Sequence, residues 1–259
     1  MMLGLEIRCS MRSIFPGKNI TVNIMCGIFG SFNFTTYETL YKKNCVRGTF
    51  AGGSIYVEQR TGDMYAKKWS GTQTEQELTG EYSLVHPGMI FAGHTQAPTS
   101  ANREYDVYTT HPFEHGRWIV AHNGVLENDR ELRVEYLKNA TGKYKGATFN
   151  ALPCTVDSAV IPALLDELYM NDDVGVLSDV FNLLRGTFAV WAYNKQTKQM
   201  YIARSGSTLF ANISESIFSS VLIDGVADEE IHPGIIYCMT VEGLAQVGSF
   251  EYDNPFFMF

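Results

Sequence analysis

The sequence predicts a layered α+β fold, in which strands gather in two parts of the chain and helices lie between them. Apolar strand segments dominate the chain after residue 25, and Arg60-Thr61-Gly62 is a hairpin signal between two of them. Two helical segments follow in the middle. The last third returns to short strands at hairpin spacing. This order favours antiparallel sheets over a parallel sheet with crossover helices.

Apolar patterns place the individual elements. Strands are expected over residues 26–32, 53–59, 63–69, 88–95, 117–123, 186–194, 199–205, 209–213, 216–223, 235–240 and 244–250. The strand at 117–123 is expected to end abruptly at Gly124. Helices are expected over Glu127–Leu137, from a cap at Thr155 to about Leu168, and over Asp173–Leu184, with a weak short helix at 74–80.

The composition narrows the classes of function. The chain has 259 residues, of which 45% are hydrophobic and 19% charged, an ordinary balance for one soluble globular domain. Its formal net charge is -8 and it has no run of lysines and arginines. Nucleic acid and anionic membrane surfaces are therefore poor candidates for partners. No apolar stretch approaches the roughly 20 residues that a membrane helix needs.

The five cysteines are widely spaced and form no Cys-x-x-Cys pair. This odd number argues against a disulfide scaffold and a structural zinc site, and we expect a reducing, cytoplasmic compartment. His111, His115 and His122 lie close in sequence, but their spacings place no two of them on a clear helical face. We therefore expect neither a metal site nor a cofactor.

Cys26 is a candidate nucleophile because Met25 precedes it. If translation starts at Met25, removal of the methionine leaves Cys26 with a free α-amine, whose unperturbed pKa of about 7.7–8.0 suits a base near neutral pH. Thiol and base then belong to one residue. The alternative is an inert cysteine in an apolar strand.

The sequence His122-Asn123-Gly124 at the end of a strand is a candidate oxyanion hole. Acyl transfer needs donors aimed at the oxyanion, and an asparagine side chain with the next backbone N–H supplies two. A plain Asn-Gly turn is the structural alternative.

Six short motifs occur in an order that resembles one enzyme family. They are MCGIFG at 25–30, RG at 47–48, GHT at 93–95, HNGVLEN at 122–128, TVDS at 155–158 and RGTFAVWA at 185–192. Together they resemble the class II glutamine amidotransferases, the Ntn-hydrolase glutaminase domains of glucosamine-6-phosphate synthase, amidophosphoribosyltransferase and asparagine synthetase. The resemblance covers about residues 25 to 243. It implies a four-layer αββα sandwich with two antiparallel sheets.

The resemblance also implies which residue has which role in the reaction. Cys26 is the nucleophile and its α-amine the base, Asn123 and Gly124 form the oxyanion hole, and Arg47 orders the site beside the nucleophile. The reaction is hydrolysis of the glutamine side-chain amide through a thioester, which gives glutamate and ammonia. Arg47 also has a plain interpretation as a surface charge before a glycine turn.

Four residues are expected to bind the substrate by the same resemblance. Asp157 matches the carboxylate that holds the α-ammonium group, Thr99 matches a threonine that contacts the carboxylate, and His94 and Gln96 lie at the neighbouring strand end. The family commonly has arginine where this chain has Gln96, and a neutral donor is weaker than a charged one. Either Arg103 compensates, or glutamine binds weakly, or the substrate is another amide. Helix dipole and loop positions are the plain interpretations of Asp157 and Thr99.

Residues ahead of the nucleophile would block this mechanism, because its nitrogen would be an amide. We therefore expect a leader at 1–24, a glutaminase domain at 25–250 and an aromatic tail at 251–259. A start at Met25 is favoured, with removal of a propeptide second and a non-catalytic relative third.

Free glutamine is the expected small-molecule substrate. Because the resembling proteins usually carry a synthase domain after the glutaminase domain, we expect a separate synthase polypeptide to receive the ammonia. The alternatives are a binding or regulatory module that keeps the fold without chemistry, and an Ntn hydrolase of a different amide.

Overall fold

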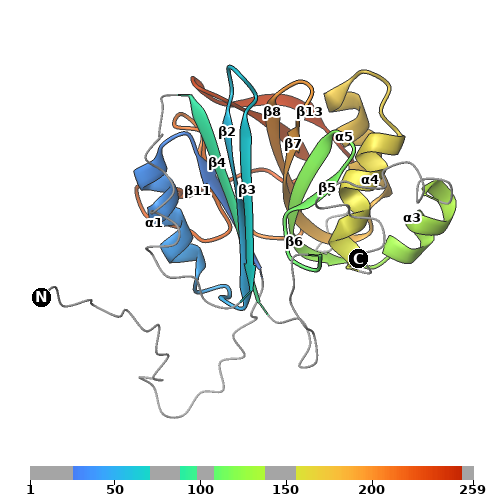
Figure 1. The fold of residues 1–259 in the computed structure, drawn as a ribbon, viewed down its shortest axis with the longest axis horizontal. Coiled ribbons are helices and arrows are strands. Elements are labelled where there is room, and N and C mark those ends of the chain that lie inside the picture. The colour runs from blue at the N-terminus through green and yellow to red at the C-terminus, as the bar shows by residue number, and fades with distance from the viewer. Residues whose placement is uncertain (1–25, 71–87, 98–107, 138–155, 253–259) are drawn as a thin grey trace, which may run out of the picture.

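The computed structural model describes residues 26–70, 88–97, 108–137 and 156–252. These residues form two antiparallel β-sheets packed face to face, with helices against both outer faces (Figure 1). The order of layers is helix, sheet, sheet, helix. The predicted four-layer α+β sandwich is therefore confirmed.

The first sheet comes mainly from the N-terminal part of the chain. Its strands are β1 (Gly27–Ser31), β2 (Ala51–Glu58), β3 (Met64–Ser70), β4 (Met89–Gln96), β9 (Phe210–Asn212), β10 (Ile217–Ser219) and β11 (Glu229–Glu230). Their order across the sheet is β11-β9-β10-β1-β4-β2-β3. Strand β1 is thus central, with β10 on one edge and β4 on the other.

The second sheet comes mainly from the C-terminal part. Its strands are β5 (Phe113–His115), β6 (Trp118–Leu126), β7 (Gly186–Asn194), β8 (Gln199–Ser205), β12 (Ile235–Thr240) and β13 (Gly243–Ser249). Their order is β13-β12-β8-β7-β6-β5. Neighbours along the chain mostly pair with each other, as short hairpin connections require.

Helices cover the two outer faces. Helix α1 (Phe34–Asn44) packs on the first sheet and begins at Asn33, whose side chain accepts a hydrogen bond from the Thr36 backbone N–H at 3.0 Å. On the second sheet lie α3 (Asp129–Tyr136), the 3-10 helix η2 (Asp157–Ala159), α4 (Val160–Glu167) and α5 (Asp173–Leu183) (Figure 1). Within the described ranges, no helix is long and apolar enough to cross a membrane.

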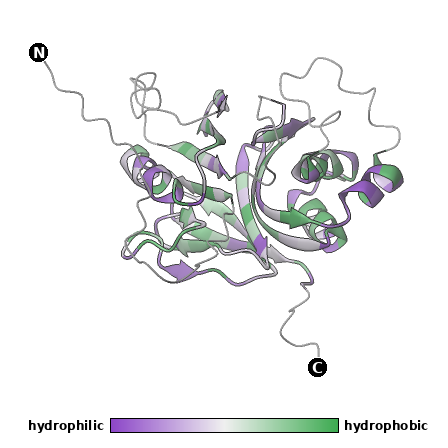
Figure 2. Cartoon of the chain, turned by 90° about the horizontal axis from the view of Figure 1, so that it is seen from below, coloured by the Kyte–Doolittle hydropathy of each residue, from purple (hydrophilic) through white to green (hydrophobic). Residues whose placement is uncertain are grey.

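Successive residues of a strand point to opposite faces of its sheet, so their apolar side chains form three core layers: one between the two sheets and one between each sheet and its helices. Ile28 belongs to the core between the sheets, whereas its neighbour Phe29 belongs to the core under α1. In the second sheet, Ile119 faces the first sheet and Val120 faces α4 and α5. Figure 2 shows the corresponding hydrophobic colouring along the strands. Each sheet therefore buries both faces, which fixes the register of the strands.

Most expected elements are confirmed, but the short strands β5 and β11 were not expected, and β10 is shorter than the expected strand over 216–223. Helix α1 was absent from the expected elements, although Tyr37, Leu40 and Tyr41 recur at helical spacing and are buried. Strand β6 does not end at Gly124, because its ladder with β7 continues to the pair Leu126–Gly186. The expected helix at 74–80 and the cap at Thr155 lie outside the described residues.

Trp191 of β7 forms a hydrogen bond between the two sheets. A substitution of Trp191 should show how much this hydrogen bond contributes to the free energy of unfolding. The fully buried indole donates from Nε1 to the Gly93 carbonyl oxygen in β4 at 3.0 Å. Trp191→Phe removes this donor, so the free energy of unfolding should fall by about 1–3 kcal/mol from the lost hydrogen bond, beyond the cost of the smaller ring.

Trp118→Phe is the matched control. Trp118 is equally buried, and its indole nitrogen has no hydrogen-bond partner among the described residues. Urea denaturation of both variants gives the comparison. Equal losses of stability would contradict a stabilising hydrogen bond between the sheets.

Candidate functional site

Cys26 lies at the amino end of β1, partly buried and outside any disulfide among the described residues. The residue after it, Gly27, has no space for a side chain. A Cβ there would lie 2.8 Å from Asn44 Oδ1 and 2.9 Å from Thr95 Oγ1. The backbone beside the thiol is therefore pressed against polar groups of α1 and β4, and glycine is required for this close approach.

Arg47 follows α1 and holds the backbone of the cysteine. Its Nε donates to the Cys26 carbonyl oxygen at 3.2 Å, and its Nη2 donates to Thr208 Oγ1 at 3.3 Å. Burial lowers the pKa of the Arg47 guanidinium below its ordinary value, and the charge of Cys26 opposes this shift. A cation beside a thiol is the kind of neighbour that stabilises a thiolate.

Asn123 and Gly124 lie on β6, in the opposite sheet. The Asn123 side chain is fully buried, and its Nδ2 donates to Ser220 Oγ at 3.1 Å. Gly124 has a φ of +152°, and a Cβ there would lie only 2.0 Å from the Thr187 carbonyl oxygen. Both its conformation and the lack of space therefore require glycine.

Ser220, just after β10, connects the two sheets at this point. Its Oγ accepts hydrogen bonds from the Ile28 backbone N–H at 3.0 Å and from Asn123 Nδ2. Its own N–H donates to the Ile28 carbonyl oxygen at 2.8 Å, and its carbonyl accepts from Thr208 Oγ1 at 3.1 Å. One serine thus joins the nucleophile's strand to the asparagine, and Thr208 extends the network to Arg47.

Asp157 is the first residue of η2 and lies against the end of β6. Its Oδ2 accepts from the Leu126 backbone N–H at 2.9 Å. Its Oδ1 lies 3.4 Å from Ser158 Oγ. The carboxylate is therefore oriented by the backbone through one oxygen, while the other makes only a long contact among the described residues.

His122 decides where the Ser158 hydroxyl points. Its Nε2 lies 3.2 Å from the Thr187 carbonyl oxygen, and its Nδ1 lies 2.8 Å from Ser158 Oγ. Burial lowers the pKa of His122, and this outweighs the opposing effects of Asp157 and the Thr187 carbonyl. The ring is therefore neutral near pH 7. Because a carbonyl only accepts, Nε2 carries the proton and Nδ1 accepts from Ser158.

The remaining predicted residues are less closely tied to the cysteine. Gln96 ends β4, and its Oε1 is buried without a hydrogen-bond partner among the described residues. His94 is fully buried, with its ring stacked on His111 at a centroid distance of 4.0 Å. Thr99 lies outside the described residues. Substrate contacts by these three residues stay predictions.

A group of potential metal ligands lies elsewhere. His115, Asp166 and Glu167 each place one ligand atom within 4.8 Å of the others. However, Asp166 Oδ1 already accepts two hydrogen bonds from Arg117, from Nε at 2.9 Å and from the backbone N–H at 3.1 Å. The carboxylate is thus engaged by a cation, and we assign no metal to this group.

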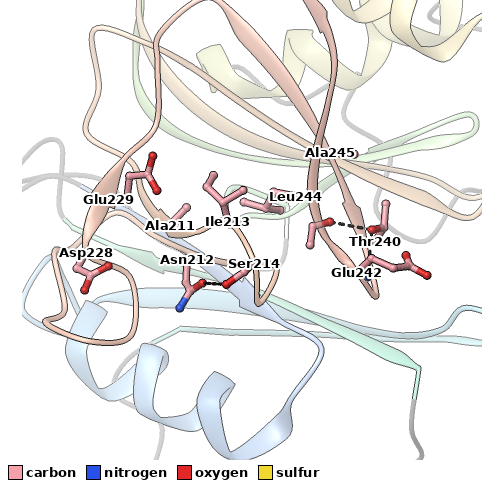
Figure 3. Close-up of a pocket in the computed structure, with 11 residues that line it drawn as sticks. Ala211, Asn212, Ile213, Ser214, Asp228, Glu229, Thr240, Glu242, Leu244 and Ala245 are labelled. Atoms are coloured by element: carbon pink, nitrogen blue, oxygen red, sulfur yellow. Dashed lines mark hydrogen bonds between the residues drawn. The ribbon is translucent and has the colours of Figure 1, made fainter.

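A cavity of about 470 Å³ lies at the far end of β9 and β10, by the turn between β12 and β13 (Figure 3). Its lining includes Asn212, Asp228, Glu229 and Glu242. None of the predicted site residues borders it. Its lining contains carboxylates and hydroxyls but no cysteine, so the candidate nucleophile Cys26 lies outside it.

Three residues of the site were not expected from the sequence: Ser158, Thr208 and Ser220. Ser158 stands in the TVDS motif beside Asp157, so its position carried a signal. Thr208 and Ser220 are ordinary hydroxyl residues of a loop and a strand end. Only the tertiary fold brings them to Cys26.

The neutral state of buried His122 predicts a pH dependence of stability. A histidine whose pKa is lower in the folded than in the unfolded chain contributes fully above the unfolded value, about 6.5, and loses its contribution as the pH falls below it. The free energy of unfolding should therefore fall between pH 7.5 and pH 5.5. In His122→Gln this fall should be smaller.

Urea denaturation at several pH values measures the effect. His232→Gln is the control for replacing a histidine by glutamine at an exposed position. If the curves of the wild type and His122→Gln run parallel, His122 is not the group responsible.

Comparison with known proteins shows which family this chain is similar to. A family model described as a glutamine amidotransferase domain matches residues 108–222, which include Asn123, Gly124, Asp157 and Ser220. The 7-cyano-7-deazaguanine synthase 2 of Sulfurisphaera tokodaii is 29% identical over 161 residues, 61% of this chain and 32% of that protein.

A second relative covers more of the chain. The glutamine–fructose-6-phosphate aminotransferase (isomerizing) of Staphylococcus epidermidis is 27% identical over 212 residues, 78% of this chain and 33% of that protein. The chain thus spans about a third of the length of these curated relatives.

The fold has counterparts among solved structures. The glutamine phosphoribosylpyrophosphate amidotransferase from B. subtilis, complexed with ADP and GMP, aligns with a TM-score of 0.61 at 18% identity, covering 86% of this chain and 49% of that one. Both the family model and the solved structure are of glutamine amidotransferases, and the solved structure shares the fold described above. Together these comparisons support a class II glutamine amidotransferase domain of the Ntn type, and the members of that family are enzymes.

Proposed function

We propose that this domain is a glutaminase, which hydrolyses the side-chain amide of glutamine and releases ammonia. The observation that carries the proposal is a group of hydrogen bonds that connects the strand after Cys26, in the first sheet, to Asn123 in the second sheet. Arg47 holds the Cys26 carbonyl, and Ser220 links the next residues of that strand to Asn123. A nucleophile and an oxyanion donor are thus fixed relative to each other, as acyl transfer requires.

The proposed reaction needs two steps. The Cys26 sulfur attacks the amide carbon while its α-amine takes the thiol proton, and a tetrahedral oxyanion forms. The amine then passes the proton to the leaving nitrogen, so the carbon–nitrogen bond breaks and ammonia departs from a γ-glutamyl thioester. Water adds to the thioester in the same way and releases glutamate and the free thiol.

Asn123 and Gly124 are proposed to stabilise the oxyanion in both steps. The donors would be one Asn123 N–H and the Gly124 backbone N–H. Removal of one such donor typically lowers kcat by about 10²–10³-fold. The constrained φ of Gly124 supports this role, because it sets the direction of the peptide groups on both sides.

Asp157 is proposed to bind the α-ammonium group of the substrate. Its Oδ2 is held by the Leu126 N–H, and Ser158 donates to His122 rather than to Oδ1. One carboxylate oxygen therefore keeps its full acceptor capacity for a cation. Gln96, Thr99 and His94 are proposed to contact or orient the remainder of the substrate.

The mechanism requires that Cys26 be the first residue of the active protein. We propose that residues 1–24 are absent from the active form, that 25–250 form the glutaminase domain, and that 251–259 form a tail. Translation from Met25 followed by removal of the methionine is the simplest route. A cytoplasmic location is part of the same proposal, because a catalytic thiol stays reduced in a reducing compartment.

Hydrolysis of another amide is the second candidate, and Gln96 is the observation that favours it. A buried neutral side chain replaces the charged residue that resembling proteins commonly place at this strand end. Such a site has less charge to bind the carboxylate of free glutamine.

Kinetics on protein that begins at Cys26 test the proposal. Ammonia release from glutamine should follow saturation kinetics, and Cys26→Ala should abolish it because the thioester cannot form. The control is Cys45→Ala, since Cys45 is also a partly buried cysteine that forms no disulfide among the described residues. It should keep near wild-type activity.

Three outcomes separate the candidates. Glutamine turnover that Cys26→Ala abolishes supports the glutaminase. Turnover of a different amide, without competition from glutamine, supports the second candidate. Binding of glutamine without turnover by a chain that starts at Cys26 would contradict both and indicate a binding module.

We further propose that the ammonia serves a synthase unit carried on a separate polypeptide. The support is that the two relatives are named as a synthase and an aminotransferase. Purification from the native host should then recover a second protein in constant ratio, and adding it with its acceptor substrate should raise the glutaminase kcat. A protein that purifies alone and is fully active would contradict a separate partner.

A further inference from the structure

The hydrogen-bonding groups of the buried Asn123 side chain are only partly satisfied among the described residues. Its carboxamide offers two donors on Nδ2 and an acceptor on Oδ1, and the side chain is fully buried. Nδ2 donates to Ser220 Oγ, while Oδ1 has no hydrogen-bond partner among the described residues. A buried acceptor without a donor is costly, because it has lost its hydration.

Ser220 shows the complementary deficit. Its Oγ accepts from both Ile28 N and Asn123 Nδ2, which fills its two lone pairs. In this arrangement its hydroxyl hydrogen has no acceptor among the described residues. A donor without an acceptor thus lies next to an amide whose acceptor is without a donor.

A half-turn of the carboxamide resolves both deficits. The two ends of an amide have nearly the same shape, so hydrogen bonding decides its orientation. After the turn, the Ser220 hydroxyl donates to Asn123 Oδ1, and Ile28 N still donates to Ser220 Oγ. The Asn123 NH₂ group then faces the side on which Oδ1 now lies, where it needs an acceptor from a ligand.

We propose that Ser220 is a positioning residue, which holds Asn123 by its Oδ1 and so turns the NH₂ group toward the substrate oxyanion. This inference rests on the proposed glutaminase function, and it explains which residue gives the oxyanion donor its direction. Since Ile28 N also binds Ser220, the direction is set relative to the strand that carries Cys26. The serine itself touches neither substrate nor reacting atoms.

A double-mutant cycle tests whether Ser220 acts through Asn123. In Ser220→Ala, kcat for glutamine should fall about tenfold with KM almost unchanged, because the donor is needed mainly in the transition state. In an Asn123→Ala background, Ser220→Ala should cause no further loss, since the group that it orients is gone. Ser220→Thr keeps the hydroxyl and should restore much of kcat.

Ser54→Ala is the matched control, because Ser54 is a fully buried strand serine hydrogen-bonded to Tyr37 on the α1 side of the first sheet. It should leave kcat unchanged. If Ser220→Ala lowers kcat by the same factor with and without Asn123, the serine acts independently and the proposal is wrong. If Asn123→Ala slows the enzyme and Ser220→Ala does not, only this inference fails.

The orientation of the Asn123 carboxamide can also be measured directly, even if the protein does not hydrolyse glutamine. A crystal structure of the protein beginning at residue 26, at better than about 1.2 Å, distinguishes the amide nitrogen from the oxygen. Oδ1 toward Ser220 supports the proposal, and Nδ2 toward Ser220 overturns it. If glutamine is not hydrolysed at all, this structure still decides the orientation while the proposed function fails separately.

Discussion

The contact of Ser220 with Ile28 and Asn123 is the interaction on which the site depends. Two sheets that meet face to face are held together by their packed apolar side chains, but the hydrophobic effect itself has little direction. Hydrogen bonds of the buried Ser220 Oγ with Ile28 N and with the Asn123 carboxamide add a directional link between the two sheets. The core supplies stability, and this polar link supplies the relative position of nucleophile and oxyanion donor.

The surrounding residues extend the same link in two directions. Toward the first sheet, Thr208 and Arg47 carry it to the Cys26 carbonyl. Toward the second sheet, Gly124 follows Asn123 on β6, and the backbone N–H of Leu126 at the end of this strand orients Asp157. Nucleophile, oxyanion hole and carboxylate therefore share one continuous backbone frame, in which a shift of any strand would move all three.

Local patterns were enough for most of the fold and for the residues with distinctive chemistry. Alternation found the strands, and helical spacing found α4 and α5, because burial of one face leaves a periodic trace in sequence. Cys26, Asn123 and Asp157 stood in motifs. Helix α1 was missed although its buried tyrosines repeat at helical spacing, and the end of β6 was misplaced because Gly124 adopts its unusual φ within a strand. Ser220 could not be found, since it is 97 positions from Asn123 and 192 from Ile28.

The central claim is that the base of the reaction is the α-amine of Cys26, and the identity of the first residue tests it most directly. The protein should be purified from its native host and analysed by N-terminal sequencing and intact mass. The purified chain should begin at Cys26 and have the mass of the sequence from residue 26 onward. A chain that keeps residues before Cys26, and that still hydrolyses glutamine, would contradict the account, because its cysteine nitrogen would be an amide and could not act as the base.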